Sequence, residues 1–315
     1  MLKKAIIFGL KGTKLTANEK YFLAKYKPWG VILFSRNIKN LYQLKFLIND
    51  IKNIFRDKNY PILIDQEGGR VSRLNKILDF SLFSQEFFAK LYSKDKNFFF
   101  HNYSVYINSV CQILKTVGIN INTVPVLDLK FKNSSQIIGD RSFSYNPKTV
   151  SKMGNICIDL YKKNKIATVI KHIPGHGRAK SDSHFKTPTV DASKKELIGK
   201  DFKPFQKNTS LFAMTAHVLY KSYDSKHTCT HSSILINKVV RKHINFDGIL
   251  ISDDISMKAL KLGLKENAIK ALNAGCNLIL HCNGNINEMN ELIKVIPNID
   301  KFIQKKTAQF YKFLG

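Results

Sequence analysis

Arginine, acidic residues, cysteine and long apolar runs are all scarce in this sequence. Only seven of the 51 basic residues are arginine, although 23 acidic residues leave a formal net charge of +28. Arginine is the usual residue for paired hydrogen bonds to anions, whereas lysine commonly covers a solvated surface. Because the lysines are spread along the chain and no RNA- or DNA-binding signature accompanies them, we expect no specific nucleic-acid partner.

The five cysteines are odd in number, widely spaced and free of any C-x-x-C pair, which fits a reducing compartment. No apolar run approaches the ~18 residues of a transmembrane helix, and the run at 5–10 is shorter than the ~7–15 residues of a signal-peptide core. We therefore expect a cytoplasmic protein with no membrane partner. Buried thiols are expected at Cys111, Cys157, Cys276 and Cys282.

A repeated local pattern organises the chain. Eight apolar runs, rich in β-branched residues, each end in a polar or glycine-containing cluster, and most intervals are long enough for a helix. Continuous apolar runs are typical of parallel strands buried on both faces. We predict one domain over residues 1–315, a (β/α)₈ TIM barrel, with a doubly wound open sheet as the alternative. The runs are 5–10, 30–37, 61–69, 121–129, 167–177, 211–220, 248–254 and 277–284.

Two of the intervals carry clear helical patterns. Residues 40–55 form an amphipathic pattern, and the phenylalanine-rich stretch 80–100 is predicted to be a helix that covers the barrel, with a ligand-binding aromatic platform as the alternative. Active sites of such barrels lie at the carboxyl ends of the strands. The polar clusters should therefore gather at one pole. They are Arg36 with Asn37, 65–73, Asp128, 171–184, His217, Asp253 with Asp254, and 281–283.

Two loop motifs combine carboxylates with arginine. In "LIDQEGGRVSRL" (63–74), Asp65 ends a strand and Arg73 follows it, which suits a polyhydroxylated ligand or a simple ion pair. In "IIGDRSF" (137–143), Arg141 either contacts a ligand or pairs with Asp140.

Adjacent carboxylates end the seventh run. Side chains of neighbouring strand residues point to opposite sides, so one of Asp253 and Asp254 can face the barrel mouth. Asp253 could then serve as a nucleophile, a general base or a metal ligand. Asp254 is the better candidate for the N-cap of the next helix.

The segment "KHIPGHGRAKSDSH" (171–184) concentrates histidine. His172, His176 and His184 with Asp182 resemble a metal site, but the intervening proline and glycines exclude a helical i, i+4 pair. Asp182 lies two residues from His184, close enough for the carboxylate to orient the imidazole. A mobile Asp–His pair opposite Asp253 is a plausible acid/base facing a nucleophile. We expect His176 to brace its loop.

Taken together, "KHIPGHG" followed by "DSH", "DQEGGRV", "GDRSF" and "SDDISM" resemble the family 3 glycoside hydrolases, and most closely their single-domain bacterial β-N-acetylglucosaminidases of peptidoglycan recycling. The similarity runs in order from about residue 5 to 285. It implies a carbohydrate substrate, muropeptides carrying terminal β-linked N-acetylglucosamine, and neither a metal nor another cofactor. The heavy lysine content departs from the family pattern, as does Ile173, where phenylalanine is common.

The resemblance also assigns roles residue by residue. Asp253 is implied as the nucleophile, His184 as the general acid/base and Asp182 as its assistant. The implied sugar-binding residues are Asp65, Arg73, Arg141, Lys171 and His172. Such an enzyme retains configuration through a glycosyl-aspartate intermediate.

Other functions remain open from the residues themselves. A β-glucosidase or a glycoside phosphorylase would share this fold, the second because a histidine acid does not repel phosphate as a carboxylate would. A metal-dependent hydrolase would use the histidines with Asp253 and would lose activity to a chelator. A non-catalytic sugar- or nucleic-acid-binding protein would bind without turnover. His217 is expected to be a core or supporting residue, and the oligomeric state is not predicted.

Overall fold

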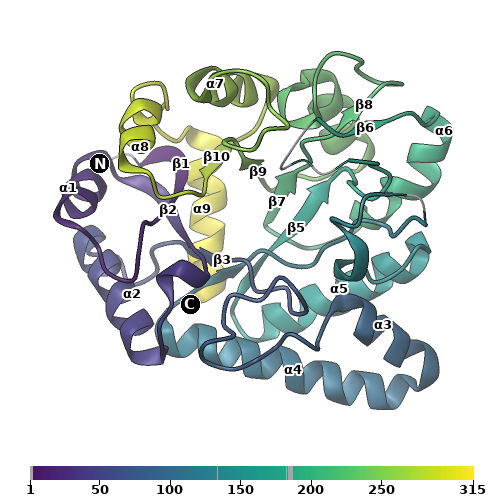
Figure 1. Cartoon of the computed structure of the whole chain (residues 1–315), viewed down its shortest axis with the longest axis horizontal. Coiled ribbons are helices and arrows are strands. Elements are labelled where there is room, and N and C mark those ends of the chain that lie inside the picture. Colours follow the sequence, from purple (N-terminus) through teal and green to yellow (C-terminus); the bar gives the residue numbers. More distant parts are fainter. Residues whose placement is uncertain (1–2, 133, 182, 184–186) are drawn as a thin grey trace.

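Eight parallel strands, one from each predicted run, close into a barrel (Figure 1). This computed structural model describes residues 3–132, 134–181, 183 and 187–315. The predicted (β/α)₈ barrel is confirmed, and the open-sheet alternative is wrong because β1 pairs with both β2 and β10. The barrel strands are β1 (Lys4–Gly9), β2 (Pro28–Leu33), β3 (Ile62–Ile64), β4 (Ile121–Asn122), β5 (Ala167–Ile173), β7 (Phe212–Thr215), β9 (Ile249–Asp254) and β10 (Leu278–His281).

Burial on both faces explains why the strands are continuously apolar. Every residue of β2, β5, β7 and β10 is buried, with the inward side chains filling the barrel and the outward ones meeting helices. A second, two-stranded sheet pairs β6 (Thr189–Val190) with β8 (Leu219–Tyr220) beside the barrel mouth.

Helices surround the barrel in Figure 1. The predicted helix at 40–55 is confirmed as α2, where the Asn40 side chain accepts the Gln43 N–H and a stripe from Leu44 to Ile51 is buried. The longer helices are α1 (Ala17–Tyr26), α2 (Leu41–Phe55), α3 (Gln85–Lys94), α4 (Lys96–Val117), α5 (Pro147–Lys163), α7 (Leu264–Ala274), α8 (Ile286–Ile293) and α9 (Lys301–Leu314). The short α6 (Lys194–Glu196) runs into a π-helical turn, Leu197–Asp201, and a second π-helical segment spans Leu235–His243.

The phenylalanine-rich stretch is helical only in part. Residues 80–84 are irregular, and the remainder belongs to two helices, α3 and the start of α4, separated at Asp95. Asp95 has extended backbone angles, and its carboxylate accepts the N–H of Phe98, so it caps α4 instead of continuing α3. The prediction of one continuous covering helix was therefore wrong, because the stretch contains parts of two helices.

The C-terminal helix closes the pole opposite the strand carboxyl ends. The Trp29 indole at the start of β2 donates to Thr307 Oγ1 of α9 at 2.9 Å, and Phe310 packs edge-on against Phe212 at the start of β7. The carboxyl ends of the strands are left to form the mouth. Among the described residues, no helix has the length and apolarity needed to cross a membrane.

Candidate active site

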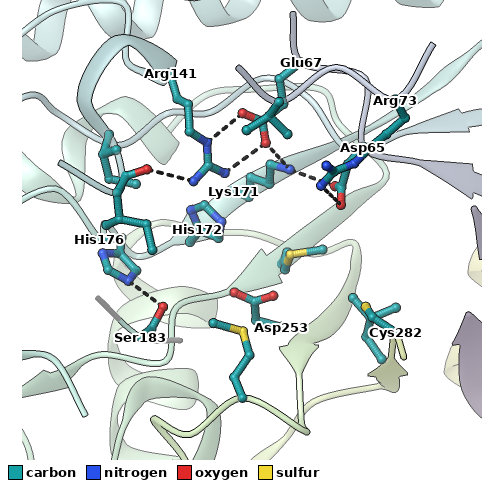
Figure 2. Close-up of a pocket in the computed structure, with 16 residues that line it drawn as sticks. Asp65, Glu67, Arg73, Arg141, Lys171, His172, His176, Ser183, Asp253 and Cys282 are labelled. Carbon is teal, nitrogen blue, oxygen red and sulfur yellow. Dashed lines mark hydrogen bonds and ion pairs between the residues drawn. The ribbon is translucent and has the colours of Figure 1, made fainter. Parts of the chain in front are cut away.

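A cavity of about 150 Å³ opens at the carboxyl ends of the strands (Figure 2). Its walls come from the carboxyl ends of β5, β7, β9 and β10 and from the segments that follow β3, β4, β5, β9 and β10, so residues far apart in the sequence meet there. All five predicted sugar-binding residues line it, together with Asp253. The polar and reactive lining residues are Asp65, Glu67, Arg73, Arg141, Lys171, His172, His176, Ser183, Asp253 and Cys282.

Asp65 stands directly after β3 and is held by two cations. Lys171 Nζ lies 2.9 Å from Asp65 Oδ1, and Arg73 Nη2 lies 3.7 Å from Oδ2. The hydroxyl of Thr123 also donates to Asp65, and Lys171 contacts the same hydroxyl at 2.9 Å. The ion pair expected from the loop motif is thus present, and the Asp65 carboxylate has a fixed orientation at the cavity wall.

Glu67 is the site residue that the sequence interpretation missed. Arg141 donates two hydrogen bonds to its carboxylate, from Nε to Oε2 at 2.8 Å and from Nη2 to Oε1 at 2.9 Å. Lys171 Nζ lies 2.6 Å from Oε1. Its side chain is only 1% exposed. The available signal was its spacing, since Glu67 follows Asp65 by two positions in the same strand-end motif.

Arg141 therefore does not pair with Asp140, which was one of its two predicted uses. Asp140 instead forms an ion pair with Arg70 at 3.0 Å. The Arg141 Nη1 donates to the Ile137 carbonyl at 3.0 Å, so three of its nitrogens are engaged around one buried carboxylate and one carbonyl. Such a guanidinium is held rigidly at the edge of the cavity.

Mutual pairing keeps this cluster charged despite burial. Burial alone would raise the pKa of Glu67, but the positive charges of Arg141 and Lys171 outweigh burial and lower this pKa to about 2. The pKa of Asp65 lies below its ordinary value for the same reason, with Lys171 and Arg73 outweighing burial. Burial would lower the pKa of Lys171, but Asp65 and Glu67 raise it above its ordinary value. Both carboxylates and the ammonium are ionised at neutral pH.

Asp128 orients the two described histidines of the 171–184 segment. Its carboxylate lies 2.6 Å from His172 Nδ1 and accepts the backbone N–H of His176 at 2.6 Å. Burial would raise the pKa of Asp128, but His172 lowers it below its ordinary value. An ionised Asp128 accepts a hydrogen bond from His172 Nδ1–H, which fixes that tautomer. The Nε2 atom of the same ring then points away from Asp128.

His176 lies within the cavity wall, where its Nε2 is 3.3 Å from Ser183 Oγ. Burial, with His172 nearby, lowers its pKa to about 4, so the ring is neutral at pH 7. Its backbone bond to Asp128 and its contact with Ser183 tie the two halves of the segment together. The expected bracing role agrees with these contacts.

Asp253 faces the cavity from β9, across from the ion-paired cluster (Figure 2). Its Oδ1 accepts the N–H of Asp254 at 2.8 Å, and no ion pair to Asp253 exists among the described residues. Burial would raise its pKa, but the imidazoles of His217 and His172 bring it below its ordinary value. Asp253 is therefore a partly buried, ionised carboxylate that has no cationic partner in the described part of the chain.

Asp254 points elsewhere and caps a turn. Its Oδ1 accepts the backbone N–H of Ser256 at 3.0 Å and that of Cys282 at 3.3 Å. The next helix, α7, begins only at Leu264, with Gly263 as its N-cap, so the predicted N-cap role of Asp254 was wrong. The chain makes an irregular turn after β9 before this helix starts.

His217 supports the strand behind Asp253 without lining the cavity. Its Nε2 lies 2.9 Å from the Asp254 carbonyl oxygen and its Nδ1 lies 2.7 Å from Thr230 Oγ1. Burial lowers its pKa below the ordinary value. A buried, hydrogen-bonded ring is what was expected of this histidine.

Cys282 corrects another expectation. It is partly exposed and lines the cavity, whereas Cys111, Cys157 and Cys276 are buried as predicted. Burial of its sulfur raises the pKa of the Cys282 thiol well above its ordinary value, so the group is a neutral thiol.

Asp182 and His184, the implied acid/base pair, lie outside the described residues. Ser183, which separates them in the sequence, does line the cavity. Within the ranges that the structure describes, no group of three or more His, Cys, Asp or Glu side chains is arranged to hold a metal ion.

Comparisons with known proteins agree on one family. A model of the glycosyl hydrolase family 3 N-terminal domain matches residues 4–309. The "Beta-hexosaminidase" of Haemophilus influenzae is 34% identical over 94% of this chain and 83% of its own length. That of Idiomarina loihiensis is 32% identical over 93% and 88%. The crystal structure of NagZ from Neisseria gonorrhoeae with N-trifluoroacetyl-D-glucosamine superposes with a TM-score of 0.87 at 28% identity, over 100% of this chain and 90% of that one.

Proposed function

The chain belongs to glycosyl hydrolase family 3, and we propose that it is an exo-β-N-acetylglucosaminidase, an enzyme that removes terminal β-linked N-acetylglucosamine. One observation carries this most directly: Asp253, an ionised carboxylate with no cationic partner in the ranges that the structure describes, faces a rigid cluster of donors and acceptors across a cavity of about 150 Å³. The curated relatives are named β-hexosaminidases, and a structural neighbour is described with an analogue of N-acetylglucosamine.

The ion-paired cluster is proposed to bind the sugar. Asp65 offers carboxylate oxygens, Lys171 and Arg73 offer N–H donors, and Arg141 offers a guanidinium edge, all at the cavity wall. Vicinal sugar hydroxyls can each donate and accept, so alternating acceptors and donors at fixed spacing suit them. His172, oriented by Asp128, adds one more polar atom.

In the proposed reaction, an Asp253 carboxylate oxygen attacks the anomeric carbon as the bond to the leaving oxygen breaks. His184 gives its proton to that oxygen, and the departing group leaves as an alcohol. Water then loses a proton to His184 and attacks the anomeric carbon, and the Asp253 carboxylate is released. Two displacements retain the configuration, and Asp182 is proposed to orient the His184 ring throughout.

We also propose the setting of the reaction. The substrates are muropeptide fragments in which N-acetylglucosamine is linked to a 1,6-anhydro-N-acetylmuramic acid unit, and the enzyme acts in the cytoplasm as a single catalytic domain. The reaction as written needs neither a metal nor another cofactor, since the proton carrier and the nucleophile both belong to the chain.

The test is an assay of the purified protein on 4-nitrophenyl β-N-acetylglucosaminide and on the matching β-glucoside, with and without EDTA. We expect turnover of the N-acetylated substrate that EDTA does not affect and that exceeds turnover of the glucoside. Failure to cleave either glycoside or a natural muropeptide would contradict the proposal. Loss of activity with EDTA would assign the histidines to a metal, and a sugar 1-phosphate formed in phosphate buffer would indicate a phosphorylase.

A further inference from the structure

A line of buried hydrogen bonds runs behind the carboxyl end of β9. It joins three side chains that are each 0% exposed: His217, which follows β7 by two residues, and the hydroxyls of Thr215 and Thr230. The His217 Nε2 lies 2.9 Å from the main-chain oxygen of Asp254, and its Nδ1 lies 2.7 Å from Thr230 Oγ1. Thr230 Oγ1 lies 2.8 Å from Thr215 Oγ1. We call this line the hydrogen-bond chain; it ends on the strand that carries Asp253.

The proton positions in the hydrogen-bond chain follow from what each atom can do. A main-chain oxygen only accepts hydrogen bonds, so the His217 Nε2 carries a proton and donates it to Asp254. Burial lowers the pKa of His217 below its ordinary value of ~6.5, so the ring is neutral at pH 7 and its Nδ1 has no proton. Nδ1 then accepts the Thr230 hydroxyl proton, and the Thr230 oxygen accepts that of Thr215. All three donors therefore point toward β9.

A charged ring does not suit this geometry. If Nδ1 also carried a proton, it would donate to Thr230, whose hydroxyl would have to turn to another acceptor. Within the described ranges that acceptor is the Ala216 main-chain oxygen at 3.4 Å, which is longer than the 2.7 Å contact with the imidazole. Burial lowers the pKa of the ring, with His172 adding to this effect, and outweighs Asp253 and Asp254, which raise it.

The residue that the ring binds, Asp254, also holds the carboxylate beside it. Its N–H donates to Asp253 Oδ1 at 2.8 Å, while its main-chain oxygen accepts both the His217 Nε2–H and the Met257 N–H, the latter at 3.1 Å. Because each residue has only two soft backbone torsions, a fixed oxygen limits the direction of the N–H of the same residue. The Met257 bond lies within the local turn, so His217 is the group that ties this residue to another part of the barrel.

We propose that His217 is a positioning residue for the nucleophile: through the Asp254 main chain it holds the N–H that orients the Asp253 carboxylate. The inference rests on the proposed function, in which Asp253 attacks the anomeric carbon, and adds to it a group that does not line the cavity. A neutral ring suits this role, since a cation this close would pair with the carboxylate and make it a weaker nucleophile. Thr230 and Thr215 act one step further back, by fixing the tautomer of the ring.

The kinetic test uses two substitutions that differ in reach. The amide nitrogen of His217→Gln can take the position of Nε2 and donate to Asp254, whereas the shorter amide of His217→Asn matches Nδ1 and cannot reach that oxygen. On 4-nitrophenyl β-N-acetylglucosaminide, we expect kcat/KM to fall about 100-fold in His217→Asn and to stay within about fivefold of wild type in His217→Gln. Binding of free N-acetylglucosamine, which we assign to the ion-paired cluster, should change less than about twofold in both.

His231→Asn is the matched control. His231 is partly buried, its Nε2 likewise lies 3.1 Å from a main-chain oxygen, that of Asn267 on α7, and it does not line the cavity. Its kcat/KM should stay within about threefold of wild type. An equal loss in His231→Asn and His217→Asn would mean that any such histidine bond matters, and that result would overturn the proposal, as would full activity of His217→Asn.

A second pair of variants keeps the test open if His217→Asn does not fold. Thr230→Val removes the hydroxyl that fixes the tautomer at nearly constant volume, and Thr230→Ser retains it. We expect kcat/KM to fall about tenfold in Thr230→Val, the effect of one lost buried hydrogen bond, and to stay near wild type in Thr230→Ser. Equal kcat/KM values in the two variants would contradict the hydrogen-bond chain.

The pH profile distinguishes positioning from a purely structural role. Burial raises the pKa of Asp253, whereas two nearby imidazoles and the Asp254 N–H lower it. If this N–H turns away in Thr230→Val, the pKa of Asp253 rises, so the acid limb of kcat/KM should move to higher pH in that variant and not in Thr230→Ser. An acid limb that stays in place in Thr230→Val would count against the proposal.

An NMR measurement separates this proposal from the proposed function. In protein labelled with ¹⁵N-histidine, the ring signals show which nitrogen carries a proton, and the signals of His217 are those lost in His217→Gln. At pH 7 we expect a proton on Nε2 alone, whether or not a glycoside is cleaved; a proton on Nδ1 would overturn the hydrogen-bond chain. If wild type cleaves the substrate and His217→Asn loses nothing, the positioning role fails while the proposed function stands. If wild type cleaves no glycoside, the proposed function fails and the positioning role with it, while the NMR result still decides the tautomer.

Discussion

The two sides of the barrel mouth differ in how their charged groups are paired. On one side, which we call the binding side, Asp65, Glu67, Arg73, Arg141 and Lys171 satisfy one another in a nearly closed network of ion pairs. On the other side, the reactive side, the Asp253 carboxylate accepts one backbone N–H within the described part of the chain and forms no ion pair there, and Met214, Met257 and Cys282 also line the cavity. The binding side is rigid because each of its charged groups is held by a neighbour of opposite charge. The carboxylate of the reactive side remains free to form a bond.

This difference implies that substitutions on the two sides have different effects on activity and on stability. Loss of a group on the reactive side should remove chemistry and leave stability nearly intact. Loss of a group on the binding side should weaken both folding and substrate binding, because its partners are left buried and unpaired.

The largest effect is expected for Asp253→Asn. The amide cannot act as the nucleophile, so kcat/KM for 4-nitrophenyl β-N-acetylglucosaminide should fall by about 10³-fold or more. Asp254→Asn is the matched control, since it removes the neighbouring carboxylate that caps a turn, and activity should stay within about tenfold of wild type. A larger loss in the control than in Asp253→Asn would reverse the roles of the two residues.

His184→Ala should give the next largest effect, and its size should depend on the leaving group. A sugar alcohol needs protonation, so cleavage of a disaccharide should slow by about 10² to 10⁴-fold. Nitrophenolate leaves with little acid assistance, so the loss on the chromogenic substrate should be smaller. His101→Ala, an exposed change on α4, is the control and should alter neither rate. Equal losses of activity on both substrates would argue against His184 as the acid.

Glu67→Gln tests the binding side. The change keeps the shape of the side chain but leaves Arg141 and Lys171 facing a neutral amide, so the free energy of unfolding should fall by about 2–4 kcal/mol and KM should rise. Glu86→Gln breaks the exposed pairs with Lys90 and Lys130 and should cost no more than about 1 kcal/mol. Both values follow from urea unfolding. Similar losses of unfolding free energy in the two variants would mean that the buried ion pairs stabilise the fold no more than the exposed pairs do.

The smallest effect concerns acid stability. The pKa of Glu67 is about 2 in the folded protein, against an ordinary value of ~4.3 in the unfolded chain. A carboxylate with a depressed pKa stabilises the fold above the unfolded value and loses that contribution as pH falls toward the folded value. The stability difference between wild type and Glu67→Gln should therefore be constant above about pH 5 and shrink by about 1.4 kcal/mol per pH unit between pH 4.3 and 2. Unfolding measured from pH 6 to pH 3 tests this, and a difference that stays constant to pH 3 would contradict it.

The sequence predicted the strands better than the contacts between their ends. Each apolar run became a barrel strand because burial on both faces requires a continuous apolar segment, and that signal is local. Glu67 was missed because its partners, Arg141 and Lys171, lie 74 and 104 residues away, and only the closed barrel brings them together. The helix break at Asp95 was missed for a different reason, since a single capping side chain outweighed a continuous aromatic pattern.

The Arg141–Asp140 pair, one of the two predicted uses of Arg141, is another contact that could not be decided from the sequence. Adjacent residues of opposite charge look like natural partners in a sequence, yet Asp140 pairs with Arg70 and Arg141 turns to the more deeply buried Glu67. A buried carboxylate needs compensation more than an exposed one does, so burial decides the pairing. Burial at a strand end depends on the whole barrel and cannot be deduced from neighbours in the chain.

Covalent trapping of the Asp253 carboxylate is the decisive test of the proposed nucleophile. Wild-type protein would be incubated with a 5-fluoro-N-acetylglucosaminyl fluoride, a substrate that slows hydrolysis of the intermediate, then digested with protease and examined by mass spectrometry. We expect one added fluorinated sugar on the peptide that contains Asp253, attached to that residue, and no such adduct in Asp253→Asn. An adduct on any other residue, or cleavage of a disaccharide to the α-anomer without an adduct, would contradict it.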